Sequence, residues 1–173
     1  MTKIYCDIAE YNKIKIFRNK SIIKGFTTNP SLMKKAGANN YEKYCIKIAK
    51  LLKNSNKTVS FEVLADDYEN MKRQAIKISK WGKNIYVKVP VINSKGEFQG
   101  KLIKFLNKKK IKINITAVFS VEQTKKILNQ IDKKTKVIIS IFAGRIGDAG
   151  KDPISIIKKC IGISKRYKNV EIL

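Results

Sequence analysis

Short runs rich in β-branched and apolar residues alternate with longer amphipathic runs along the whole chain. The expected strands cover residues 3–8, 22–26, 58–64, 84–89, 111–117, 136–142 and 169–173. Between them, apolar residues recur at spacings of three and four, the period of a helix with one buried face. This alternation is typical of a parallel sheet covered by helices.

Capping residues mark several of the expected helix starts. Ser120 is followed by Gln123, the spacing of a capping box, and Asp152 precedes a proline in the position that proline favours at the first helical residue. Asp66 is the expected N-cap of a helix whose apolar face holds Tyr68, Met71, Ala75 and Ile78. Another predicted helix carries on one face Tyr41, Tyr44, Cys45, Ile48, Leu51 and Leu52.

Polar residues at alternating strand positions favour a barrel over an open, doubly wound sheet. Parallel strands covered on both faces read as nearly continuous apolar runs. Here five strands carry polar residues on one face, near their carboxyl ends: Asp7, Glu62, Lys88, Asn114, Thr116 and Ser140. The sequence also has no Gly-rich loop after its first strand, as a dinucleotide-binding sheet would have. We therefore predict an α/β fold of the parallel (β/α)8 TIM-barrel type with a polar mouth, the end at which such barrels hold their active sites.

The composition removes several kinds of catalysis. The 173 residues include no histidine, which excludes histidine-based nucleophile systems, histidine-ligated zinc and histidine acid–base catalysis. Any catalysis must use lysine, carboxylates and hydroxyls.

The net charge of +25 raises the alternative of nucleic-acid binding. The chain has 34 lysines but only four arginines, the residue that makes most base-edge contacts. The lysines are spread over every predicted helix, as on a solvated surface. We therefore expect anionic substrates and no specific nucleic-acid site.

The three cysteines lie far apart, without a C-x-x-C spacing, and are interpreted as reduced, buried thiols. No apolar run approaches the about 18 residues that span a bilayer, and the N-terminus lacks a signal-peptide pattern. These features predict a cytoplasmic protein without a membrane partner.

Lys88 is the strongest candidate for a reactive side chain, because it lies in an otherwise apolar strand. Burial disfavours its charged form, and a neutral amine can attack a carbonyl to form a Schiff base. Asp7 and Glu62 are expected on the same face, where two acids could divide the accompanying proton transfers. The alternatives are a lysine that extends to solvent and an ion-pair network without chemistry.

Two segments at strand ends supply further candidates. Residues 25–31 end the second strand with hydroxyls and an amide, which is either an ordinary turn or part of a substrate site. Arg145 follows the sixth strand in what we predict to be a glycine-framed loop. It is either a phosphate ligand or part of a surface salt bridge.

These residues together resemble the transaldolase family, the Schiff-base class I aldolases that include small fructose-6-phosphate aldolase-like members. The resemblance runs in order from Asp7 to Asp148 through residues 7–9, 25–32, 60–63, 86–90, 114–120 and 140–148. Each motif is weak alone, but six in order at successive strand ends form a strong signal.

The resemblance implies roles for ten residues. Lys88 would form the Schiff base, Asp7 would take the C4 hydroxyl proton, and Glu62 and Thr116 would hold a proton-relaying water. The substrate would be bound by Thr27, Asn29, Asn114, Ser140, Phe142 and Arg145, of which Arg145 would hold the phosphate. The resemblance implies sugar phosphates as partners, is compatible with a homo-oligomer, and requires no metal and no organic cofactor. Glu62 and Phe142 resemble true transaldolases, because the fructose-6-phosphate aldolases carry glutamine and tyrosine at these positions.

The expected strands number seven, whereas a closed barrel has eight. We therefore expect residues 1–173 to form a single (β/α) barrel domain that is incomplete at its C-terminus and covers about the first six to seven βα units. The chain could be a fragment, could be completed by a partner copy, or could be an inactive relative. The functional alternatives are fructose-6-phosphate aldolase-like cleavage, a basic nucleic-acid-binding module and a structural barrel fragment.

Overall fold

A computed structural model describes residues 3–173 of the chain. Seven strands form one parallel sheet in chain order: β1 (Ile4–Asp7), β2 (Ile23–Thr27), β3 (Thr58–Glu62), β4 (Ile85–Pro90), β5 (Ile113–Val118), β6 (Val137–Ile141) and β7 (Val170–Ile172). The helices between them are α1 (Tyr11–Phe17), α2 (Pro30–Lys35), α3 (Tyr41–Leu52), α4 (Tyr68–Ser79), α5 (Gly100–Lys108), α6 (Val121–Leu128), α7 (Ala143–Asp148) and α8 (Pro153–Ser164).

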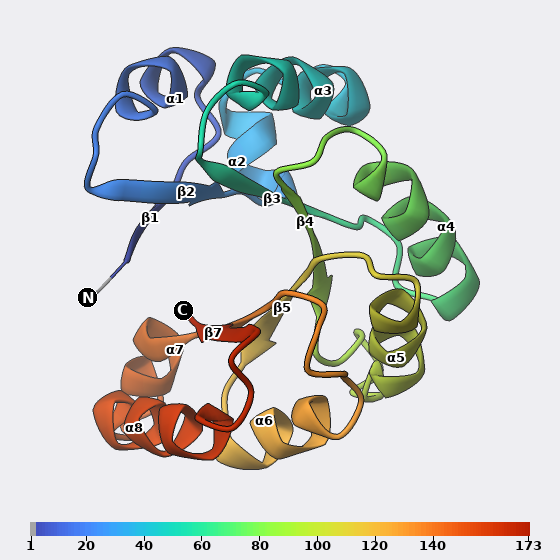
Figure 1. The fold of residues 1–173 in the computed structure, drawn as a ribbon, viewed down its shortest axis with the longest axis vertical. Coiled ribbons are helices and arrows are strands. Elements are labelled where there is room, and N and C mark those ends of the chain that lie inside the picture. The colour runs from blue at the N-terminus through green and yellow to red at the C-terminus, as the bar shows by residue number, and fades with distance from the viewer. Residues whose placement is uncertain (1–2) are drawn as a thin grey trace.

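The sheet curls into a partial barrel with the helices on its outer side (Figure 1). Its two edge strands, β1 and β7, come to face each other across the seam of the barrel. The predicted α/β fold of the (β/α)8 type is therefore confirmed for these seven strands, and all seven expected strands are present.

Alternate strand residues point outward and form the core beneath the helices. On β3, β4 and β5 these are apolar and almost completely buried: Val59, Phe61, Ile85, Val87, Val89, Ile113 and Ile115. Helix residues with the predicted spacing pack against them, among them Ile48, Leu52, Met71 and Ile78. The intervening strand residues occupy the inner face, which leaves that face available for polar groups.

Two local predictions at helix starts are corrected or refined. Asp67, not Asp66, caps α4 by accepting a hydrogen bond from Asn70 N, because Asp66 instead binds the backbone and hydroxyl of Ser94. Ser120 caps α6 as predicted, but the Gln123 side chain accepts from Phe119 N rather than from Ser120 N.

The predicted glycine-framed loop around Arg145 is wrong, because these residues form the short helix α7. Its first glycines have helical backbone angles, and the buried Ile146 anchors the turn to the core. The glycine that ends the helix is Gly150, at φ +71°. Asp152 and Pro153 then begin α8 as predicted. Within residues 3–173, no helix has the length and apolarity needed to cross a membrane.

Candidate active site

Lys88 and Glu62 meet on the inner face of the barrel. They occupy paired positions on the neighbouring strands β4 and β3. Lys88 Nζ lies 3.3 Å from Glu62 Oε2, and the two side chains are only 8% and 19% exposed. A buried amine beside a half-buried carboxyl has both the nucleophile and the proton carrier that carbonyl chemistry requires.

Opposing effects act on the pKa of the Glu62 carboxyl. Burial raises its pKa, the positive charge of Lys88 opposes that rise, and the more distant Asp7 adds to it. Lys88 Nζ also donates a hydrogen bond to the carbonyl of Thr28, at 3.1 Å. A carboxyl whose pKa is raised in this way can carry a proton at a higher pH than an exposed glutamate.

A buried hydrogen-bond chain crosses the inner face beside this pair. Asn114 Nδ2 donates to Ser60 Oγ at 3.0 Å, and Ser140 Oγ donates to Asn114 Oδ1 at 2.8 Å. All three residues are at most 9% exposed. Because Asn114 pairs with Lys88 in the strand register, these hydrogen bonds fix the side chains next to the amine of Lys88.

Thr116 lies two residues beyond Asn114 on β5 and pairs with Pro90. Its Oγ1 is buried without a hydrogen-bond partner, and such a group normally binds water or ligand. The register with β6 shifts between Ile115 and Val118, a segment that includes Thr116, and Ala117 adopts the left-handed region at φ +58°. Strained backbone of this kind concentrates at functional sites.

Asp7 and Thr27 occupy the first two strands at the same end of the barrel. Thr27 Oγ1 donates to Asp7 Oδ1 at 2.7 Å, and the two residues pair in the strand register. Asp7 is exposed, whereas Thr27 is buried. Asn29 uses its side-chain oxygen to cap α2 by accepting from Leu32 N, which fixes the orientation of its amide.

The last two predicted residues lie at the start of α7. Phe142 is the N-cap residue and packs edge-on against Phe119, with ring centroids 5.7 Å apart. Arg145 is 75% exposed and lies 3.8 Å from the exposed Asp148, an arrangement that leaves its guanidinium accessible to solvent. The surface salt bridge considered from the sequence is thus present, and no contact joins Arg145 to the Lys88 cluster among the hydrogen bonds and ion pairs of residues 3–173.

Three residues near Lys88 were not predicted as site residues. Thr28 supplies the carbonyl that accepts from Lys88, and its own hydroxyl donates to Ser60 O. Tyr41 hydrogen-bonds the backbone of Glu62. Thr28 and Ser60 had a usable signal in the sequence, because Thr28 lies in the polar segment 25–31 and strand alternation places Ser60 on the same face as Glu62.

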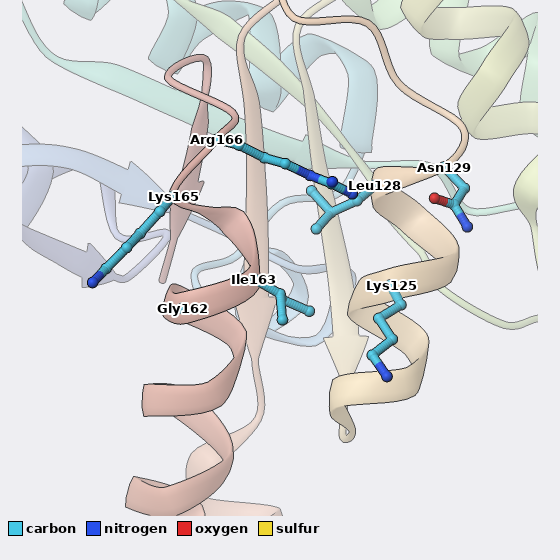
Figure 2. Close-up of a pocket in the computed structure, with 7 residues that line it drawn as sticks. All are labelled: Lys125, Leu128, Asn129, Gly162, Ile163, Lys165 and Arg166. Atoms are coloured by element: carbon cyan, nitrogen blue, oxygen red, sulfur yellow. The ribbon is translucent and has the colours of Figure 1, made fainter.

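Two of the pockets in residues 3–173 bear on the position of the site. One, of about 530 Å³, lies between the carboxyl-terminal ends of α6 and α8 and is lined by Lys125, Leu128, Asn129, Gly162, Ile163, Lys165 and Arg166 (Figure 2). It contains none of the predicted site residues. The other, of about 300 Å³, lies between α3 and α4, and its lining includes Tyr41 and Glu62. Among residues 3–173, no group of three or more cysteine and carboxylate side chains is placed to hold a metal ion.

A structural relative shows the same fold in a different protein. The chain superimposes on the probable 3-DHS dehydratase of Bacillus anthracis with a TM-score of 0.54 over 96% of this chain and 70% of that one. Because the two sequences are only 12% identical, this likeness concerns the fold alone.

Comparison of sequences identifies the family of the chain as well as its fold. The model of the family "Transaldolase/Fructose-6-phosphate aldolase" matches residues 4–173. A probable transaldolase of Dehalococcoides mccartyi is 33% identical over 165 residues, covering 95% of this chain and 72% of the relative. One from Methanococcus vannielii is 34% identical over 166 residues, covering 95% and 71%. One from Nitrosopumilus maritimus is 32% identical over 169 residues, covering 98% and 71%. The chain therefore belongs to the transaldolase/fructose-6-phosphate aldolase family.

Proposed function

We propose that this protein is a transaldolase that transfers a dihydroxyacetone unit from a ketose phosphate to an aldose phosphate, with Lys88 as the Schiff-base residue. The observation that carries the proposal is the buried contact of 3.3 Å between Lys88 Nζ and Glu62 Oε2. We further propose that it acts in the cytoplasm, on fructose 6-phosphate or sedoheptulose 7-phosphate of the non-oxidative pentose phosphate pathway.

In the first step, Lys88 gives a proton to Glu62, and the amine so freed attacks the C2 carbonyl of the ketose. The carbinolamine that forms loses water to give an iminium, which requires one proton delivered to the leaving hydroxyl. Glu62 is proposed to relay that proton through a water shared with Thr116. The unpartnered, buried hydroxyl of Thr116 supports this role, because it has a free hydrogen-bonding site within the polar face.

The second step breaks the bond between C3 and C4. Asp7 is proposed to take the proton of the C4 hydroxyl, and the electrons of the breaking bond flow to the iminium to give an enamine. The aldose phosphate is released, and the enamine carbon then adds to the acceptor aldehyde. Hydrolysis of the new iminium returns Lys88 to its free state, so that atoms and charges balance over the cycle.

The remaining residues are proposed to bind the substrate. Asn29 and Asn114 would hold the dihydroxyacetone hydroxyls, and Thr27, Ser140 and Phe142 would line the site. The buried chain through Ser60, Asn114 and Ser140 supports this for the amide of Asn114, since both of its ends are oriented by partners. Arg145 would bind the phosphate, which its exposed guanidinium permits.

Fructose-6-phosphate aldolase activity is the second candidate within the family. Glu62 and Phe142 favour transfer, by their resemblance to true transaldolases. The two activities differ in the fate of the enamine: an aldolase releases free dihydroxyacetone, whereas a transferase retains the unit until an acceptor aldehyde arrives.

Borohydride trapping tests the proposal directly. Incubation with fructose 6-phosphate and borohydride, followed by intact mass and peptide mapping, is expected to give one reduced adduct at Lys88. Lys57 is an internal control, because it is equally buried but its Nζ binds two backbone carbonyls. The Lys88→Met variant should give no adduct. A folded wild-type protein without an adduct, or with labelling at Lys57, would overturn the proposed function.

A further inference from the structure

Strand β2 leaves the sheet before it can pair with the end of β3. Its last paired residue is Thr27, opposite Ser60, after which the chain turns into α2. In a parallel ladder, successive residues direct their backbone groups to alternate sides. Val63 N donates to Lys88 O on the β4 side, so the N–H and C=O of Glu62 point to the side that β2 has vacated. Buried backbone groups of this kind need another partner.

The hydroxyl of Tyr41 is that partner. It donates to Glu62 O at 2.7 Å and accepts from Glu62 N at 3.0 Å, so a single side chain replaces both hydrogen bonds of a missing strand residue. Tyr41 is the first residue of α3, whose start is fixed by the Asn40 cap on Lys43 N. Burial raises the pKa of Tyr41 well above its usual range, so the hydroxyl keeps its proton and remains a donor.

We propose that Tyr41 is a positioning residue that holds Glu62 against Lys88, a role that rests on the proposed function of these two residues. Lys88 is held from the same side, because Thr28 O, in the segment that leaves the sheet, accepts from its Nζ. Two contacts therefore act where β2 has left the sheet: Tyr41 holds the backbone of Glu62, and Thr28 O holds the amine of Lys88. Neither Tyr41 nor Thr28 needs to touch substrate in this role.

The environment of the contact predicts what its loss would do. Both Tyr41 and Glu62 line the pocket between α3 and α4. Without the hydroxyl, water from this pocket can bind the freed backbone groups and hydrate the carboxyl. Since burial is the main cause of the raised pKa of Glu62, that pKa should fall in a Tyr41→Phe variant.

The kinetic test compares Tyr41→Phe with Tyr44→Phe. Tyr44 lies on the same helix, and its hydroxyl also bonds backbone, but at Ala9 and Tyr11 rather than at Glu62. Tyr41→Phe should lower kcat of the transaldolase reaction about tenfold and change KM less than about twofold. The reason is that a displaced Glu62 carboxyl impairs the proton transfer but not the binding of substrate. The alkaline limb of its pH–rate profile, where Glu62 loses the proton that it donates, should move to lower pH. Equal effects of the two variants, or an unchanged kcat and profile in a folded Tyr41→Phe, would refute the proposal.

Two measurements do not depend on activity. Carbon-13 NMR titration of the Glu62 carboxyl, assigned with Glu62→Gln, should show a lower pKa in Tyr41→Phe; an unchanged or raised pKa counts against the role. In the unmutated protein, the amide of Glu62 should exchange with solvent as slowly as that of Val63, although it has no strand partner. Fast exchange there would overturn the contact without any variant. Absence of an adduct at Lys88 would defeat the proposed function and leave these two results standing, so the two failures can be told apart.

Discussion

Glu171 of β7 accepts hydrogen bonds from Tyr5 of β1, at 3.2 Å, and from Lys3 directly before that strand, at 2.7 Å, although β1 and β7 are opposite edges of the sheet. These side chains join the two edges at the amino-terminal end of the barrel, across the seam that Figure 1 shows. The contact brings residues 166 and 168 positions apart in the chain together. These hydrogen bonds thus connect the two edges of the sheet at the end of the barrel opposite to Lys88.

The seam contact predicts a modest and specific loss of stability in Glu171→Gln. Lys3 is 53% exposed, so solvent screens its ion pair, and most of the expected loss of about 1 kcal/mol comes from the half-buried bond to Tyr5. Urea unfolding measures it. Burial and the charge of Glu171 raise the pKa of Tyr5 to about 12, so this pKa should fall in the variant, as read by ultraviolet titration against Tyr5→Phe.

The control for the seam is Glu69→Gln, which removes an exposed pair with Lys72 within α4. It should change stability by less than about 0.5 kcal/mol. If both variants behave alike, or if the Tyr5 pKa is the same in Glu171→Gln, the contact across the seam does not exist in solution.

Lys88 and Glu62 predict a stability that depends on pH. The pKa of Glu62 is raised in the folded state, so its favourable contribution is present below the usual glutamate range and is lost as pH rises through the raised value. Lys88 opposes this loss. Lys88→Met should therefore cost about 3 kcal/mol near pH 7, because it leaves a buried carboxylate unpaired.

The double variant Lys88→Met/Glu62→Gln isolates the cause. It should be more stable than Lys88→Met near pH 7, and urea unfolding at several pH values should show the difference closing at about pH 4, where the carboxyl of the single variant is protonated. A difference that stays constant over this range would show that Glu62 does not titrate as a buried group.

Much of the fold was predictable because its signals are local. Strand alternation alone put Glu62, Lys88, Asn114 and Ser140 on one face, and the strand register then brings Glu62, Lys88 and Asn114 side by side. Helix starts were less certain, since Asp66 and Asp67 are chemically identical and Ser94, which decides between them, is distant in sequence. The helix α7 was mistaken for a loop because glycines 144 and 147 do not reveal that the buried Ile146 holds the turn in helical form.

The supporting contacts of the site were not predictable from the sequence. Tyr41 has the spacing of a residue on the apolar face of α3, and nothing local reveals that its hydroxyl reaches Glu62, 21 positions later. The same holds for the carbonyl of Thr28, which carries no side-chain signal at all. Residue type identifies the reactive side chains in the sequence. The groups that orient them can be identified only once the path of the folded chain is known.

Gly25 predicts a steric test of the packing between β1, β2 and β3. A Cβ at this position would lie 2.8 Å from Thr58 O and 2.7 Å from a ring carbon of Tyr5. Gly25→Ala should therefore cost about 1–3 kcal/mol in urea unfolding, because the backbone carbonyl cannot move aside. In Gly162→Ala, on α8, the new methyl group meets no atom within 4 Å, and the helix should gain about 0.5–1 kcal/mol. A tolerated Gly25→Ala would mean that the strands are further apart than described.

Trp81, the sole tryptophan of the chain, reports on the core behind the candidate site. It packs edge-on against Phe61, at 5.9 Å between ring centroids, and Phe61 is fully buried on β3 next to Glu62. Phe61→Ala should cost about 3–5 kcal/mol, because it leaves a cavity that the sheet cannot fill, and it should change the tryptophan emission of the folded protein. Phe119→Ala is the matched control, since Phe119 is 38% exposed and lies beside Phe142 instead. It should cost less than half as much and leave the emission unchanged, whereas equal costs would contradict the assignment of Phe61 to the core.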